Sequence, residues 1–322
     1  MMDAISLPPS VVTLPPDGVS GSVNILSRSD EQMELPDDVE LPDDVLDNDG
    51  HSDGELEHIN GFDDAADSFD EEEQHNQLLA LVDIEHPGHV PPPHVAKRLT
   101  LSHDVAEFYS PPRVLSVANS RGLTGCLSLD KLTGWDFQAI NLRSLSLDLL
   151  AILSIMMVIL SPPCTIFSEL QRLFNFKKMS HASITSKWAE GMLYLTHAMD
   201  CCLRQYHQGR FFVFEHPASA TSWKQDVVMR VAALLNVWVV VFDQCMCGLT
   251  SPVQKVPMRK RTKLMTNSRF IAARFAGKLC DKSHVHQEIT GSEGGIRRSV
   301  WAQRYPPLMV DSLVQGILDH RR

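Results

Sequence analysis

Residues 155–168 read Ile155-Met-Met-Val-Ile-Leu160, followed by Ser161-Pro-Pro-Cys-Thr-Ile-Phe-Ser168. The first six residues form an uninterrupted apolar run, which is typical of a strand buried on both faces of a parallel sheet. The two prolines end that strand and, because they restrict the backbone, hold the next side chain, Cys164, in place. Ligands of open α/β sheets bind beyond the carboxyl ends of the strands. This stretch therefore predicts a parallel sheet with a cysteine at its ligand-binding edge.

The rest of residues 97–322 alternates between strand-like and helix-like segments. The predicted strands are 113–118, 126–129, 155–160, 210–214 and 237–242. The predicted helices are 141–150, 183–207, 223–235 and 308–320. Such alternation predicts an α/β, Rossmann-like, mostly parallel sheet with helices on both faces.

Charge is distributed unevenly along the chain of 322 residues, whose formal net charge is −11. Residues 1–96 hold 24 of the 40 acidic residues and one of the 29 basic ones, so they carry −23 and residues 97–322 carry +12. Residues 1–96 also have scattered apolar positions and recurring prolines, ending at Pro91-Pro92-Pro93. This composition predicts a disordered acidic N-terminal region, 1–96, before one folded domain, 97–322.

The charge pattern also predicts partners. A domain of +12 attracts a polyanion through counterion release, so we expect it to bind DNA, with RNA as a possible substitute. Three functions stay open for the acidic tail: binding to the basic domain as a mimic of nucleic acid, binding to a protein partner, or solvation.

Several classes of protein are not expected. The longest apolar run, 149–160, has 12 residues with Ser154 inside it, whereas a membrane span needs about 20. The chain begins Met1-Met2-Asp3 without a basic segment leading into an apolar one, so no secretory signal is predicted. Seven cysteines are an odd and ordinary number, which does not suit a disulfide scaffold. We therefore expect a nuclear or cytoplasmic protein.

Polar residues directly follow the predicted strands: Asp130, Cys164, Glu215 and Asp243-Gln244. A cysteine held at a strand end is a candidate nucleophile in its thiolate form, and a buried structural cysteine is the alternative. A glutamate one strand away is a candidate general acid, and an acid at a helix N-terminus is the alternative.

Three short motifs occur in a recognisable order: Pro163-Cys164, Glu215-His-Pro217 and Val256-Pro-Met-Arg-Lys-Arg261. Together they resemble motifs of the DNA cytosine-5 methyltransferase family. The resemblance implies that Cys164 attacks C6 of a cytosine flipped out of the duplex and that Glu215 holds the pyrimidine N3. It also implies that Arg259 and Arg261 support the flipped base and the phosphates.

The same resemblance implies S-adenosyl-L-methionine as the cofactor. The candidate contacts are Asn119, Gly122, Asp130, Asp136 and Pro162. Asp130 stands where Rossmann-like folds place their ribose-binding acid, and Asp136 is the candidate for the adenine amine. The family's Phe-x-Gly-x-Gly motif is replaced here by Ser116-Val-Ala-Asn-Ser-Arg-Gly122.

Two readings of the activity stay open. About 40 residues separate Arg261 from Trp301, too few for the family's separate target-recognition domain. The pair of Ser-Pro-Pro-Cys-Thr and Glu-His-Pro-Ala also resembles diverged methyltransferase-like sequences associated with mobile elements. That resemblance implies a catalytically inactive, mobile-element-derived nucleic-acid-binding protein as the alternative to an active DNA (cytosine-5-)-methyltransferase.

A second cluster of chemistry-bearing residues has a spacing typical of metal ligands. It reads Cys280-Asp-Lys-Ser-His284-Val-His286, and Cys245-Met-Cys247 is a source of further ligands. Zinc takes four ligands in a tetrahedral array. The alternative is that these are loop residues close to the nucleic acid. The sequence makes Cys280, His284 and His286 metal candidates and assigns no metal.

Overall fold

The computed structural model describes residues 103–168, 171 and 175–321. The predicted disordered region 1–96, and with it the boundary that separates it from the folded domain, lies outside these residues.

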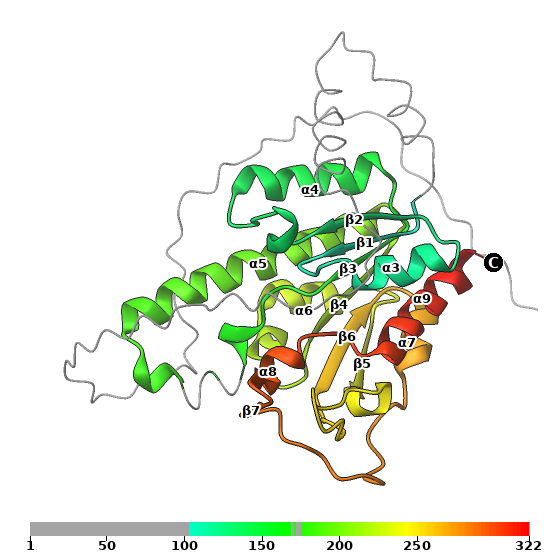
Figure 1. The fold of residues 1–322 in the computed structure, drawn as a ribbon. Coiled ribbons are helices and arrows are strands. Elements are labelled where there is room, and N and C mark those ends of the chain that lie inside the picture. Colours follow the sequence, from blue (N-terminus) through cyan, green and yellow to red (C-terminus); the bar gives the residue numbers. More distant parts are fainter. Residues whose placement is uncertain (1–102, 169–170, 172–174, 322) are drawn as a thin grey trace, which may run out of the picture. The chain divides into compact units, whose positions relative to one another are not determined.

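A six-stranded sheet forms the centre of the described part of the chain (Figure 1). Its strands, in chain order, are β1 (Val105–Phe108), β2 (Gly125–Leu129), β3 (Met157–Leu160), β4 (Phe211–Pro217), β5 (Trp238–Asp243) and β6 (Arg261–Thr266). They lie side by side in the order β2-β1-β3-β4-β6-β5. β6 is antiparallel to both of its neighbours, while the pairs that join β2, β1, β3 and β4 are parallel. The predicted mostly parallel α/β sheet is confirmed.

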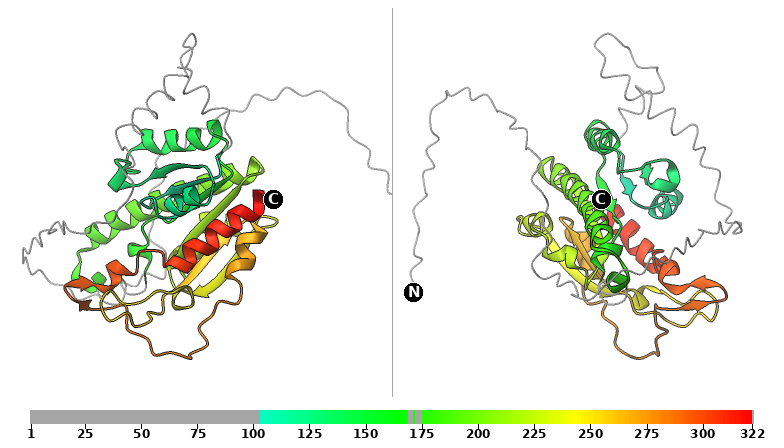
Figure 2. Two further views of the ribbon diagram at one scale, coloured as in Figure 1. Left: turned by 45° about the vertical axis from the view of Figure 1, so that its right-hand side comes forward. Right: turned by 90° about the vertical axis from the view of Figure 1, so that its left-hand side faces the viewer.

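Helices cover both faces of this sheet. On one face α3 (Arg113–Ser120) and α7 (Arg269–Phe275) pack against α9 (Pro307–Arg321). Figures 1 and 2 show α7 and α9 side by side there. On the other face α5 (His181–His207) contacts both α4 (Ile140–Ile152) and α6 (Asp226–Ala232). The chain also forms a short helix, α8 (Arg298–Trp301), and a small hairpin of β7 (Ser292–Glu293) and β8 (Ile296–Arg297).

The main core lies between the sheet and the α3, α7 and α9 layer. Met157 and Ile159 of β3 point into it because alternate residues of a strand face the same side. From α9, Met309, Leu313 and Ile317 enter the same core at a spacing of four residues, which places them on one face of the helix. The predicted helix 308–320 is thus confirmed as α9, which packs on this face of the sheet.

The strand order reverses between β1 and β3. β1 leads outward to β2, after which the chain returns through α4 to β3 on the other side of β1. In open α/β sheets such a reversal opens a crevice beyond the carboxyl ends of the strands. Cys164 follows β3 at this edge.

The predicted strand at 113–118 is wrong, because these residues form α3. Pro111 and Pro112 precede the helix and suit its start, where no intrahelical N–H bond is lost. The carboxylate of Glu107 accepts hydrogen bonds from the backbone N–H groups of Val114 and Leu115 at distances of 2.9 to 3.0 Å. The strand that precedes this helix is β1, whose buried glutamate interrupts the apolar pattern by which strands are predicted.

The other predicted elements correspond to observed ones with shifted ends. Strands 126–129, 155–160, 210–214 and 237–242 are β2, β3, β4 and β5, and helices 141–150, 183–207 and 308–320 are α4, α5 and α9. The predicted helix 223–235 is shorter, because a 3-10 turn at Thr221–Lys224 precedes α6. β6 was not predicted, since its basic residues suggested a nucleic-acid contact and not a strand.

Gly191 of α5 lies against the turn that follows Cys164. A Cβ atom there would overlap the side chain of Ile166 and lie 3.3 Å from the Phe167 ring. Gly→Ala in a helix normally stabilises by about 1 kcal/mol. We expect Gly191→Ala instead to destabilise by about 1–3 kcal/mol, because the added methyl overpacks the core. Urea unfolding measures this difference.

The control is Ser186→Ala, at an exposed position of the same helix. It should leave the free energy of unfolding unchanged or slightly raised. If Gly191→Ala were as stable as Ser186→Ala, the close packing of α5 against Ile166 and Phe167 would be contradicted.

Candidate functional site

The parallel pairing of β3 with β4 brings the two predicted catalytic residues to one edge of the sheet. Leu160 pairs with Phe214, so the residues that follow each of them emerge at the same end. Glu215 is buried at the end of β4, and Cys164 is partly exposed after β3. Burial raises the pKa of the Cys164 thiol, the charge of Lys260 lowers it, and the charge of Glu215 raises it. The three groups therefore lie within electrostatic range of one another.

Glu215 has unused hydrogen-bonding capacity. Its Oε1 atom is buried and has no hydrogen-bond partner among the described residues. The Nζ atom of Lys260 lies 3.6 Å from that oxygen, which makes an ion pair but not a hydrogen bond. A buried carboxylate oxygen without a hydrogen bond is costly, so a position of this kind calls for an explanation such as an absent ligand.

His216 fixes the two strand ends to each other. Its Nε2 lies 3.0 Å from the carbonyl oxygen of Pro162, and its Nδ1 lies 2.7 Å from the hydroxyl of Ser222. Burial lowers the pKa of His216 to about 4, so the ring is neutral near pH 7. Because a carbonyl only accepts, Nε2 carries the proton and Nδ1 accepts from the serine. Pro162, predicted to contact the cofactor, is thus held by His216 two residues before Cys164.

Tyr305 completes the same edge from the segment that precedes α9. Its hydroxyl is hydrogen-bonded to Ser161, the first residue after β3. Burial and the charge of Glu215 raise the pKa of Tyr305 well above its ordinary value. The sequence did not indicate the role of Tyr305 or the positioning role of His216. His216 lies in the Glu215-His-Pro217 motif, but Pro162 is 54 residues away, and Ser161, the partner of Tyr305, is 144 residues away.

The basic residues Arg259, Lys260 and Arg261 make different contacts. Arg261 donates from Nε and Nη2 to the two carboxylate oxygens of Asp243, at 2.9 and 2.8 Å. Hydrogen bonding to Arg261 lowers the pKa of the fully buried Asp243. Arg259 is exposed, and Lys260, which was not predicted, is the residue that contacts Glu215. The geometry thus separates Lys260, at the candidate site, from Arg261, which orders Asp243.

Asn119 and Gly122 lie at the other end of the sheet from Cys164. Asn119 is near the C-terminal end of α3, and its Oδ1 accepts from the N–H of Gly125, where β2 begins. Gly122 adopts a φ of 77° in the turn between these elements. Their predicted cofactor contact assumed a strand at 113–118. That strand is wrong, because the segment is a helix whose far end meets the start of β2, and the contact itself stays a prediction.

Asp130 and Asp136 lie on the candidate-site side, after the carboxyl end of β2. Asp130 Oδ1 accepts from the N–H of Leu132 at 2.9 Å and caps the 3-10 turn Lys131–Thr133. Asp136 accepts from the N–H of Gln138 at 3.0 Å and forms an ion pair with Lys131 at 3.8 Å. Both are partly exposed, so both stay candidates for contact with a ligand.

The turn between β1 and α3 does not fit a cofactor bound in the Rossmann manner. Such a cofactor approaches the backbone at a glycine-rich turn and receives N–H groups of the helix N-terminus. Here Pro111 and Pro112 supply no N–H, and the N–H groups of Val114 and Leu115 are already bound by Glu107. Burial raises the pKa of Glu107 to about 7, with the helix N–H groups opposing that effect.

The metal candidates come together with one of the two further cysteines. The ligand atoms of Cys245, Cys280, His284 and His286 all lie within 4.8 Å of one another. Cys247 belongs instead to the main hydrophobic core.

The described residues define a Rossmann-like α/β protein with a cysteine and a glutamate at the carboxyl edge of its sheet. No protein-family model and no curated protein matches the chain. Among solved structures it is similar to the Entamoeba histolytica methyltransferase EhMeth, with 15% sequence identity and a TM-score of 0.31. The match covers 61% of this chain and 58% of that one. No helix within the described part of the chain is long and apolar enough to cross a membrane.

Glu107 predicts an unusual dependence of stability on pH. Its pKa is about 7 in the folded protein against an ordinary 4.5. Ionisation of Glu107 therefore lowers the free energy of unfolding. The stability that the protonated form provides is fully present below pH 4.5 and is lost as the pH rises to about 7. The difference amounts to about 3 kcal/mol. Glu107→Gln cannot ionise, so wild type should lose about that much stability relative to it over this range.

Urea unfolding at pH 4.5 and at pH 7.5 measures the difference. Glu288→Gln, which removes an exposed carboxylate, is the control for the change in net charge. If the free energy of unfolding of the wild type changed between these two pH values by the same amount as that of Glu107→Gln, the raised pKa of Glu107 would be contradicted.

Proposed function

We propose that this protein is a methyltransferase-like DNA-binding protein that acts on cytosine, with Cys164 as the nucleophile and Glu215 as the group that holds the base. S-adenosyl-L-methionine is the proposed methyl donor. The observation that carries the proposal is the buried Oε1 of Glu215, which has an ion pair with Lys260 but no hydrogen bond among the described residues, within electrostatic range of the partly exposed Cys164. The site thus joins a nucleophile, a carboxyl group and a cation.

The chemistry on the base follows from these three groups. The Cys164 thiolate adds to C6 of cytosine, forming an S–C6 bond, while the electrons of the C5–C6 double bond move toward C5 and the ring. Glu215 in its protonated form donates a hydrogen bond to N3, where the negative charge would otherwise develop, and so lowers the barrier to addition. Lys260 favours the thiolate, because its charge lowers the pKa of Cys164 against the effect of burial.

Binding of DNA is part of this proposal. The base must leave the helical stack to reach the sheet edge. The excess of basic residues in 97–322, including the exposed Arg259, supports electrostatic attraction of the phosphate backbone. RNA has the same backbone charge and is the alternative substrate.

The second candidate function is a catalytically inactive nucleic-acid-binding protein with the same fold, derived from a mobile element. One observation favours it: Glu107 and the two prolines take the place of the glycine-rich turn that a cofactor needs. In this reading the base-binding half of the site is intact and methyl transfer is lost.

Two modified DNA substrates separate these functions. Duplex DNA with pyrimidin-2-one in place of cytosine reports on the cysteine alone, because the missing amino group makes C6 more open to addition. Duplex DNA with 5-fluorocytosine retains the enzyme covalently only after methyl transfer, because fluorine cannot leave as a proton does. We expect an adduct with pyrimidin-2-one, and an S-adenosylmethionine-dependent adduct with 5-fluorocytosine if the protein is an active enzyme.

Matched variants assign the adducts. Cys164→Ser should abolish both, and Glu215→Gln should slow their formation by roughly 100-fold or more, the size of a lost general acid. Cys126→Ser, at another partly exposed cysteine, should leave them unchanged. No adduct on either DNA would refute the catalytic proposal, and an adduct on pyrimidin-2-one alone would favour the second candidate, in which methyl transfer is lost.

The acidic tail gives a further expected outcome, although it lies outside the described residues. If residues 1–96 bind the basic domain as a mimic of nucleic acid, a protein without them should bind DNA more tightly at low salt, and salt should reduce the difference. Fluorescence anisotropy at two salt concentrations measures both affinities. Equal affinities would leave a protein partner or solvation as the function of the tail.

A further inference from the structure

Four potential metal ligands meet near the end of β5, outside the candidate methyltransferase site. Cys245 belongs to the 3-10 turn Gln244–Cys247, which directly follows β5. Cys280, His284 and His286 come from the loop that follows α7. Their ligand atoms all lie within 4.8 Å of one another, although 35 residues separate the first two. The fold thus joins two distant segments at one point.

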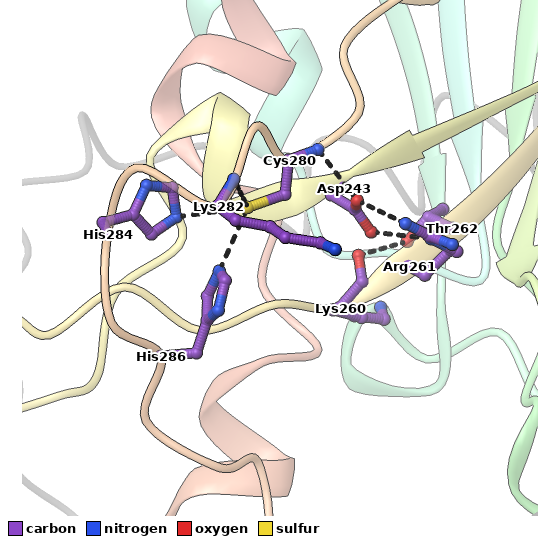
Figure 3. Close-up of polar contacts among 8 residues, drawn as sticks. All are labelled: Asp243, Lys260, Arg261, Thr262, Cys280, Lys282, His284 and His286. Atoms are coloured by element: carbon purple, nitrogen blue, oxygen red, sulfur yellow. Dashed lines mark hydrogen bonds and ion pairs between the residues drawn. The ribbon is translucent and has the colours of Figure 1, made fainter.

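The distances match those of a tetrahedral site. Cys280 Sγ lies 3.7 Å from His284 Nε2 and 3.4 Å from His286 Nε2. Figure 3 shows both imidazole rings pointing toward this sulfur. A tetrahedral zinc ion with Zn–S near 2.3 Å and Zn–N near 2.0–2.1 Å separates such ligand atoms by about 3.6 Å. The two cysteine–histidine pairs therefore already have the spacing that one shared ion requires, and the Cys245 sulfur lies within 4.8 Å of the other three ligand atoms.

The backbone of the loop is arranged around the Cys280 sulfur. The N–H of Lys282 donates to that sulfur at 3.3 Å, and Asp281 accepts from the N–H of Ser283 at 2.9 Å. Lys282 has a φ of 63°, a conformation that is unfavourable for a residue with a side chain. This tight turn directs the chain back, so that His284 and His286 face the cysteine.

A second set of contacts holds the cysteine itself. The N–H of Cys280 donates to Asp243 Oδ2 at 2.9 Å, and the same carboxylate receives both hydrogen bonds from Arg261. Figure 3 shows Asp243 between Cys280 and Arg261. Hydrogen bonds that orient the ligands from outside are a regular part of protein metal sites.

We propose that Cys245, Cys280, His284 and His286 bind one zinc ion. Two thiolates and two imidazoles in a tetrahedral array are a ligand set typical of zinc, and four protein ligands leave no open position for a substrate. The ion is therefore structural: it ties the loop after α7 to the end of β5. The proposal is independent of the activity proposed for Cys164.

The proposed zinc site is linked to the candidate functional site around Glu215. Arg261 is the first residue of β6, and Lys260, just before it, contacts Glu215. Because Asp243 links Cys280 to Arg261, the ion stabilises the segment that carries Lys260. Removal of zinc should lower thermal stability, since a metal that binds only the folded state stabilises it.

The test uses the full chain, purified under reducing conditions and dialysed, with its metal content measured by mass spectrometry. We expect one zinc per chain in wild type and its loss in Cys280→Ser and in His286→Asn. The controls are Cys126→Ser and His207→Asn, which change a cysteine and an exposed histidine elsewhere and should keep the metal.

Cobalt substitution tests the ligand set directly. Co²⁺ bound at this site should show the visible absorption of a tetrahedral ion together with sulfur-to-metal charge transfer. His286→Cys keeps four ligands, so it should still bind Co²⁺ with stronger charge transfer, which excludes simple misfolding as the cause of metal loss.

Three results would overturn the proposal. The first is wild-type protein without zinc that also fails to take up Zn²⁺ or Co²⁺. The second is zinc that persists in Cys280→Ser and His286→Asn. The third is a disulfide between Cys245 and Cys280 that persists in reductant and excludes the metal.

Discussion

The arrangement of the site depends on the pairing of β4 with β3 on one side and with β6 on the other. The parallel pair places Cys164 and Glu215 at one edge, and the antiparallel pair brings Lys260 back to the same edge. A shift of one residue in either register would turn Glu215 to the opposite face, because side chains alternate along a strand. His216 opposes such a shift, since its ring is hydrogen-bonded to both Pro162 and Ser222.

Buried carboxylates at this edge are compensated in three different ways. Glu107 is bound by the N–H groups of α3, and Asp243 is bound by both donors of Arg261. Glu215 has only an ion pair at 3.6 Å and an oxygen without a hydrogen bond among the described residues. The first two groups are satisfied by the protein and act in its structure. The third keeps free capacity, which is what a group that binds a ligand requires.

The sequence predicted correctly those elements that a local pattern of residues determines. The apolar run before Pro162 identified β3, and the positions of Cys164 and Glu215 after their strands indicated that both lie at one edge of the sheet. It failed where a tertiary contact overrides that pattern. β1 carries a buried glutamate that a strand pattern excludes, and only the partner N–H groups of α3 explain it. The sequence predicted Arg259 and Arg261 as site residues and did not predict Lys260, which lies between them. Which of these neighbouring side chains faces Glu215 is set by the pairing of β6 with β4, which the sequence does not show.

The two halves of the candidate site follow different constraints. At the ends of β3 and β4, Cys164, Glu215 and Lys260 are held by strand pairing and by His216. At the end of β1, the turn that leads into α3 is closed by the Glu107 carboxylate and two prolines, and Asn119 and Gly122 lie at the far end of the sheet. Glu215 is only 6% exposed and has an oxygen without a hydrogen bond among the described residues, where an apolar side chain would cost less. Under the proposed function this cost is accounted for by binding of a base, which does not depend on the turn between β1 and α3.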